Sequence, residues 1–239
     1  MGRQVLSAAV WLLSVADVAG LGTRWGAMPA HPEANPSRPS THQGSTIGQA
    51  TSTEERTVPV SERTFQQLAL EDPEGHWELY CGHLRRKPGM TFAHNHAQVW
   101  LTVQLAQQLD RHRFDVRGNA GHVRRSPENY FIPDVFVIPL ELAESFRERR
   151  DVLEWYDAPL PLVVEIWSPS TGDYDVDTKL SEYQRRGDLE IWLLHPFDRT
   201  LTAWRRQPDG SYAESHYTGG KVQPVALPTV TIDLDTLFD

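Results

Sequence analysis

The chain has 239 residues, enough for one domain of ordinary size and a tail, and its 39% apolar and 23% charged residues exclude a fibrous or wholly disordered protein. The formal charge of −9 argues against a protein that coats DNA regardless of sequence, although a local basic groove still lets an acidic protein bind nucleic acid. The single cysteine, Cys81, excludes an internal disulfide, a zinc ribbon and an iron–sulfur cluster, and we expect a reducing, cytoplasmic location.

Residues 1–57 are expected to form an N-terminal extension. Their apolar run, Val5–Leu21, has three explanations that stay open: a secretory signal, a native helix, or upstream sequence that precedes the true first residue, Met28. Asp17 interrupts this run, which is too short and too charged to span a bilayer, so we expect no membrane segment. The stretch from Pro29 to Thr57 is rich in Pro, Ser, Thr, Gly, His and Gln, and we expect it to be disordered.

The folded domain is expected to span residues 58–239 and to begin with a short helix. Ser61 is placed to cap this helix, in which Phe65, Leu68 and Ala69 recur at helical spacing. The elements expected after it are a β-hairpin of Trp77–Tyr80 and His83–Lys87, a helix from about Asn95 to Asp110, strands Phe114–Arg117, Asp134–Ile138 and Leu162–Trp167, a helix from about Asp175 to Arg186 that ends at Gly187, and strands Leu189–Leu194, Leu201–Arg205 and Tyr212–Tyr217. Strands that enclose a few helices predict an α/β (α+β) domain with a mixed sheet.

The second helix carries an apolar stripe that we expect to face the core. Val99, Val103, Ala106 and Leu109 recur at intervals of three and four residues, and Trp100 lies beside them.

Two carboxylates stand where ionised groups are costly. Asp134 opens an apolar strand after Pro133, and Glu165 interrupts a run that is otherwise typical of a strand buried on both faces. If the two strands are neighbours, the carboxylates converge, and a pair of hard oxygen ligands is how proteins hold Mg²⁺ against a phosphodiester. Lys179, early in the following helix, is the expected source of a nearby ammonium group. The alternative is two structural carboxylates that arginines or backbone donors satisfy.

A resemblance to a known family rests on a longer set of residues. These are Pro133-Asp134-Val135, the run from Leu162 to Thr171 with its Glu165-Ile166-Trp167-Ser168-Pro169-Ser170-Thr171 end, then Asp175, Lys179, Tyr183, Gly187, the run Ile191–Pro196, Trp77-Glu78-Leu79, His96, and the segment from Leu227 to Phe238. Together they resemble the Uma-two family of putative restriction endonucleases, in the PD-(D/E)XK nuclease superfamily. Two departures from the family pattern are His195, in place of an acidic residue, and the bulky Trp167.

The resemblance implies a restriction-endonuclease-like fold, with a four-stranded mixed core sheet flanked by helices and with extra antiparallel strands. It also implies hydrolysis of nucleic-acid phosphodiesters, with DNA as the expected substrate, and a divalent metal, Mg²⁺ or in its place Mn²⁺. Asp134 and Glu165 would be the metal ligands, and Lys179 would replace the lysine that the superfamily places two residues after the glutamate. Glu78 and His96 match positions that would complete the catalytic site.

Some of these assignments have plainer alternatives. Glu78 is also placed for a cross-strand ion pair with Arg85 or Arg86, and His96 for capping or packing at a helix start. The functional alternatives are a nuclease-fold protein that binds nucleic acid with little turnover, and a metal-dependent hydrolase of another substrate. A homodimer is also expected, because nucleases that cut both strands often act as pairs.

Overall fold

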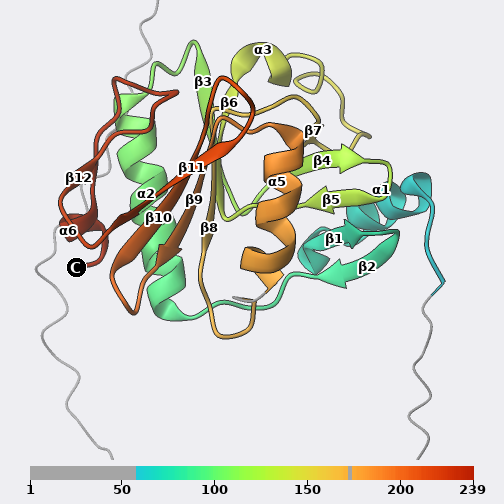
Figure 1. The fold of residues 1–239 in the computed structure, drawn as a ribbon. Coiled ribbons are helices and arrows are strands. Elements are labelled where there is room, and N and C mark those ends of the chain that lie inside the picture. The colour runs from blue at the N-terminus through green and yellow to red at the C-terminus, as the bar shows by residue number, and fades with distance from the viewer. Residues whose placement is uncertain (1–57, 172–173) are drawn as a thin grey trace, which may run out of the picture. The chain divides into compact units, whose positions relative to one another are not determined.

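The computed structural model describes residues 58–171 and 174–239, so the sequence-based expectations for residues 1–57 lie outside the described part of the chain. The elements follow the predicted order closely (Figure 1). The helices are α1 (Glu62–Glu71), the 3-10 turn η1 (Pro73–Gly75), α2 (Phe92–Gln108), α3 (Leu140–Ala143), the π-helical turn η2 (Asp175–Lys179), α5 (Leu180–Arg186) and α6 (Leu234–Leu237). The strands are β1 (Trp77–Tyr80), β2 (His83–Arg86), β3 (Phe114–Gly118), β4 (His122–Ser126), β5 (Asn129–Phe131), β6 (Val135–Pro139), β7 (Trp155–Tyr156), β8 (Leu162–Ile166), β9 (Glu190–His195), β10 (Thr200–Arg206), β11 (Tyr212–Tyr217), β12 (Lys221–Val222) and β13 (Ile232–Asp233).

A six-stranded mixed sheet forms the centre of the domain, in the order β11-β10-β9-β8-β6-β3. Strands β8 and β9 run parallel, and the other neighbours in this sheet run antiparallel. Every residue of β8 is buried, as expected of a strand covered on both faces. The predicted mixed sheet is therefore confirmed, with β3, β6, β8 and β9 as four adjacent strands inside a wider sheet.

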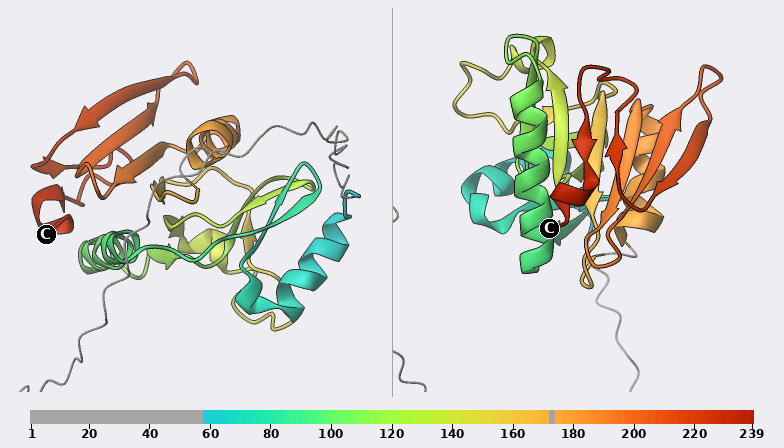
Figure 2. Two further views of the ribbon diagram at one scale, coloured as in Figure 1. Left: turned by 90° about the horizontal axis from the view of Figure 1, so that it is seen from below. Right: turned by 90° about the vertical axis from the view of Figure 1, so that its left-hand side faces the viewer.

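Helix α2 covers one face of this sheet (Figure 2). Its buried side consists of His94, Ala97, Leu101 and Leu105, and the last three belong to one apolar cluster with residues of β6 and β8. The stripe expected from the sequence was wrong for Val99, which is 58% exposed, and for the exposed Ala106, whereas Leu109 does pack against the core. The helix begins at Phe92, three residues before the expected start at Asn95. The Thr91 side chain caps it by accepting a hydrogen bond from the amide of His94. Apolar residues occur on both sides of α2, so periodicity alone does not select the buried side.

The opposite face of the sheet is covered by α5 (Figure 1). Tyr183 of this helix is buried against Val163 and Ile191 of the two parallel strands. The helix ends, as predicted, at Gly187, whose φ of 83° is the left-handed conformation that glycine adopts without strain. The turn before α5 is π-helical, and its residues are those that reach the site described below.

A second sheet, in the order β2-β1-β5-β4-β7, packs against α1. Phe65 and Ala69 on α1 contact Leu79 of β1 and Tyr130 of β5, which gives this sheet its own small core. The expected hairpin of β1 and β2 is confirmed, with Glu78 opposite Arg85 in the register. The strands β4, β5 and β7 had no individual prediction from the sequence.

Candidate active site

Asp134 and Glu165 lie at the ends of two adjacent inner strands of the six-stranded sheet, on the same side of the sheet along the strand direction. Strands β6 and β8 pair antiparallel with Val135 opposite Val164. Asp134 precedes Val135 and Glu165 follows Val164, so the two carboxylates continue the same register. The amide of Ile166 donates a 2.7 Å hydrogen bond to Oδ2 of Asp134, which fixes the aspartate against the end of β8. The convergence expected from the sequence therefore rests on a defined strand pairing.

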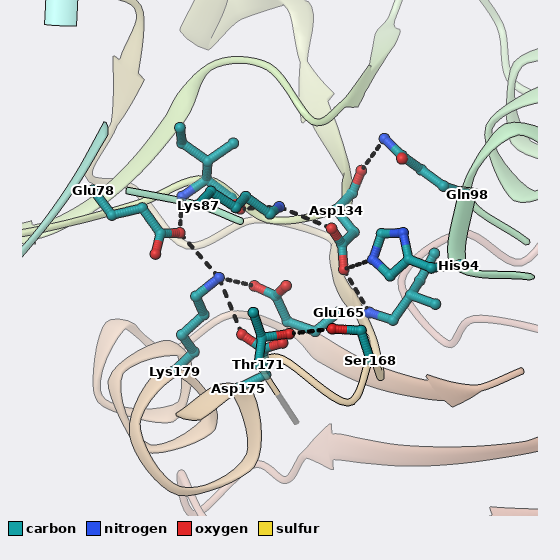
Figure 3. A network of polar contacts seen from close by, with 12 residues as sticks. Glu78, Lys87, His94, Gln98, Asp134, Glu165, Ser168, Thr171, Asp175 and Lys179 are labelled. Atoms are coloured by element: carbon teal, nitrogen blue, oxygen red, sulfur yellow. Dashed lines mark hydrogen bonds and ion pairs between the residues drawn. The ribbon is translucent and has the colours of Figure 1, made fainter. Parts of the chain in front are cut away.

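Asp134 is surrounded by donors although it is 1% exposed (Figure 3). The ammonium of Lys87 lies 2.8 Å from Oδ1, and Nε2 of His94 lies 3.0 Å from Oδ2. Burial alone would raise the pKa of the carboxyl, but the attraction of Lys87 and the contact with His94 outweigh it and hold the pKa well below its ordinary value. Asp134 is therefore ionised at neutral pH.

Lys179 lies inside a cage of three carboxylates (Figure 3). Its Nζ is 2.9 Å from Oε1 of Glu78, 3.2 Å from Oδ1 of Asp175 and 3.3 Å from Oε1 of Glu165. Asp175 and Lys179 are the first and last residues of the π-helical turn, so this turn supplies both an acid and the amine. Burial would lower the pKa of the amine, yet the three carboxylates raise that pKa well above its ordinary value, and Lys179 stays protonated.

Glu165 is buried and has one oxygen without a hydrogen-bond partner in the described part of the chain. Its Oε1 accepts a 2.5 Å hydrogen bond from the hydroxyl of Tyr183, whereas its Oε2 is buried and has no hydrogen-bond partner among the described residues. Burial raises the pKa of Glu165 well above its ordinary value, against the opposing attraction of Lys179. A cavity of about 10 Å³ lies beside Glu165 and Asp175, on the order of the space one water molecule needs.

The donor set fits a hard divalent cation by its chemistry. Carboxylate oxygens are the ligands that Mg²⁺ prefers, and the unpartnered Oε2 of Glu165 is one such oxygen that no protein donor occupies. The arrangement is nevertheless closed, because Lys87, His94 and an amide already contact Asp134. In the described part of the chain, no three acidic, histidine or cysteine side chains are grouped closely enough to hold a metal ion by themselves. A cation at this place would therefore compete with the ammonium of Lys87 for Asp134.

Comparison with known proteins identifies the family. A sequence model of Uma2, described as "Putative restriction endonuclease", matches residues 63–235. The chain belongs to this family. Among solved structures, it is similar to a putative nuclease belonging to DUF820 from Anabaena variabilis ATCC 29413, with a TM-score of 0.62 and 17% identity, over 75% of this chain and 98% of that one. At this identity the likeness establishes the shared fold and nothing further. No curated protein matches the chain.

Four of the five site residues expected from the Uma2 resemblance lie together, and one does not. Asp134, Glu165, Lys179 and Glu78 are joined through the contacts above or through the β6–β8 pairing. His96 lies elsewhere: its ring contacts Phe92 and Trp100 on α2, at 5.7 and 6.1 Å between centroids. Positions two apart on a helix face in nearly opposite directions, which is why His94 reaches Asp134 and His96 does not.

The contacts of these residues bear on the plainer alternatives. The ion pair suggested for Glu78 with Arg85 or Arg86 was wrong, because its Oε1 contacts Lys179 and accepts the amide of Ile132 at 2.9 Å. A backbone donor does satisfy part of Asp134, as the structural alternative proposed. No arginine within the described ranges forms an ion pair with Asp134 or Glu165.

Sequence reasoning missed Lys87 and His94. Lys87 follows two arginines at the end of the hairpin and reads as a solvated charge. The structure instead buries its ammonium between the carbonyl of Ile132 and Asp134, both at 2.8 Å. Asp175 was expected at the helix start and is found there, but its side chain also pairs with Lys179.

Several arginines near the second sheet and α5 are already paired with acidic side chains. Arg124 pairs with Glu62, Arg125 and Arg185 both pair with Glu182, and Arg186 pairs with Asp188. A surface cavity of about 820 Å³ that includes Arg111 and Arg113 lies near Pro139, at the opposite end of β6 from Asp134. None of the helices in the described part of the chain is long and apolar enough to cross a bilayer.

Proposed function

We propose that residues 58–239 form an endonuclease domain that hydrolyses phosphodiester bonds of nucleic acid, with DNA as the substrate. Family membership supports this class of reaction. The observation that carries the proposal is Lys179, a protonated amine 1% exposed and held beside Glu165 and Glu78 at the end of the sheet where Asp134 lies. Buried cations of this kind stabilise the charge that develops on a reacting phosphate.

Asp134 and Glu165 are the residues that would hold Mg²⁺, with Mn²⁺ as a substitute. When bound, such an ion polarises a phosphoryl oxygen and lowers the pKa of water. The support for this part is the oxygen donor set and the unpartnered Oε2 of Glu165. Asp134 contributes a carboxylate that is ionised at neutral pH, because Lys87 lowers its pKa.

The side chains around these ligands have distinct roles in the proposed reaction. Lys179 is a hydrogen-bond donor and a fixed positive charge rather than a general base, because its raised pKa keeps it protonated. Glu78 and Asp175 hold the amine in place. His94 orients Asp134, while the role expected for His96 stays a prediction with no contact to this group. A cytoplasmic location and a homodimer remain parts of the same proposal.

The second candidate is a nuclease-fold protein that binds nucleic acid with little turnover. One observation favours it: the ammonium of Lys87 already neutralises Asp134, at 2.8 Å, with both groups buried. A binding protein has no need to break this pair, whereas a nuclease that recruits a metal does. A metal-dependent hydrolase of another substrate would use the same site, so only the identity of its substrate distinguishes it from these two candidates.

The test is cleavage of plasmid and single-stranded DNA with Mg²⁺, with Mn²⁺ and with EDTA. Asp134→Asn and Glu165→Gln each replace a carboxyl group by an amide of nearly the same shape, and Asp209→Asn, in an exposed turn, is the matched control. We expect metal-dependent nicking that falls roughly 100-fold or more in the two site variants and is unchanged in the control. Nicking that persists in Glu165→Gln would refute the site.

The same proteins separate the second candidate from the first. Thermal unfolding is measured with and without each metal. One outcome is that no DNA is cleaved but the metal stabilises the parent chain and not Asp134→Asn. That outcome would support the metal site and contradict the endonuclease, leaving a binding protein or a hydrolase of another substrate.

A further inference from the structure

Arg85 is an exposed cation at the edge of the site. It lies on β2 directly opposite Glu78, and residues opposite each other in an antiparallel pair project from the same face of the sheet. Glu78, however, is already engaged by Lys179 and by the amide of Ile132. Arg85 consequently forms no ion pair with any residue in the described ranges, unlike most of the other arginines near this sheet.

Tyr174 fixes the position of this free guanidinium. The Cζ atom of Arg85 lies 3.6 Å from the centroid of the Tyr174 ring, a close stacking distance. The same ring has Nζ of Lys179 at 5.8 Å, and Tyr174 immediately precedes Asp175 in the chain. One aromatic ring thus connects the exposed Arg85 to the buried amine.

A stacked guanidinium is well suited to a phosphate. Stacking occupies the face of the group and leaves its N–H donors in the plane, where they match two phosphate oxygens at once. Holding the side chain against a ring also reduces the conformational entropy lost on binding. An unpaired, pre-positioned cation next to the reacting centre is available to an anion that comes from outside the chain.

We propose that Arg85 binds a backbone phosphate of the nucleic-acid substrate next to the scissile phosphodiester, and that Tyr174 is the positioning residue for it. This inference rests on the proposed function, because it assigns a substrate contact of the same site. Arg86 has no such arrangement: its Cζ is 5.9 Å from the Trp77 ring, and its Nη2 lies 3.5 Å from the carbonyl of Glu74.

The test is the salt dependence of binding to a short fluorescein-labelled single-stranded oligonucleotide, measured by anisotropy in EDTA and again with Ca²⁺. Arg85→Gln is compared with Arg86→Gln, which removes the same charge from the next residue. We expect roughly tenfold weaker binding at low salt for Arg85→Gln, and a slope of log K against log[salt] smaller by about 0.7. Arg86→Gln should leave both quantities close to those of the parent chain.

The role of Tyr174 has its own conservative variant. Tyr174→Leu should reproduce part of the loss, whereas Tyr174→Phe, which keeps the ring, should bind as the parent chain does. Equal effects of Arg85→Gln and Arg86→Gln would overturn the inference, as would a parent chain that binds no oligonucleotide. Cleavage without an Arg85 effect would refute the inference and leave the nuclease standing. Oligonucleotide binding that shows the Arg85 effect, without cleavage in Mg²⁺ or Mn²⁺, would support the phosphate contact and refute the proposed nuclease activity.

Discussion

Replacing Lys179 by Met tests the cage of carboxylates most directly. Methionine fills a similar volume without the charge, so Glu78, Glu165 and Asp175 lose the ammonium that lies within 3.3 Å of each. Removing one partner of a buried ion pair costs about 3–5 kcal/mol, because the remaining charge is left uncompensated. For a domain of this size that loss corresponds to roughly 6–20 °C in the midpoint of thermal unfolding.

The loss should also depend on pH, with a sign that follows from the acids. Burial raises the pKa of Glu165 and of Asp175 against the attraction of Lys179, so without Lys179 these two carboxyl groups bind protons still more tightly in the folded chain than in the unfolded chain. Such groups favour folding more as the pH falls, so the stability difference between Lys179→Met and the parent should shrink on acidification.

The assay is urea unfolding of both proteins across neutral to mildly acidic pH, followed by circular dichroism. Lys221→Met is the matched control, because Lys221 is exposed and forms no ion pair among the described residues, so we expect a change below about 0.5 kcal/mol. A Lys179→Met protein within about 1 kcal/mol of the parent at neutral pH, or a deficit that does not shrink on acidification, would refute this account of the cage.

Three other residues give predictions away from the site. His122 is buried, and burial lowers the pKa of its imidazole. The free energy of unfolding should therefore decline as the pH falls below the ordinary histidine pKa of 6.5, and His122→Phe should flatten this decline in urea unfolding. Phe65→Ala should cost about 3–5 kcal/mol, because Phe65 is fully buried between α1 and the second sheet; calorimetry that found less than about 1 kcal/mol would contradict the packing described. Gly187→Ala should cost about 1–2 kcal/mol in the same measurement and Gly187→Asn less, since the left-handed backbone, not a steric contact, is the obstacle.

The sequence was most informative where a residue broke a strong local pattern. Glu165 stands alone in an apolar run, so both the buried strand and the unusual carboxylate were evident before the structure. Gly187 follows a run of helical residues and marked the end of α5 correctly. The prediction that Asp134 lies near Glu165 depended on one assumption, that their strands are neighbours. The pairing of β6 with β8 confirms that assumption.

What the sequence hid depends on contacts between distant segments. Lys87 and Asp134 are 47 residues apart, and nothing near Lys87 distinguishes it from the arginines that precede it. The sequence also does not distinguish His94 from His96, because the side of α2 that faces the sheet is known only from the structure.

The short strands were hidden for another reason. Strand β4, with the sequence HVRRS, is too polar to show an alternating pattern, and β5 has three residues. Both are stabilised by the sheet around them and by α1 rather than by local preference.

The burial of two ammonium groups also determines how the chain reacts with amine reagents. The sequence has three lysines, and every other cationic side chain except histidine is an arginine. The side chains of Lys87 and Lys179 are 5% and 2% exposed, while Lys221 is exposed on β12. An acylating reagent should therefore modify Lys221 first among the lysines. Acylation of Lys179 would report, by mass spectrometry, that the cage of carboxylates has opened.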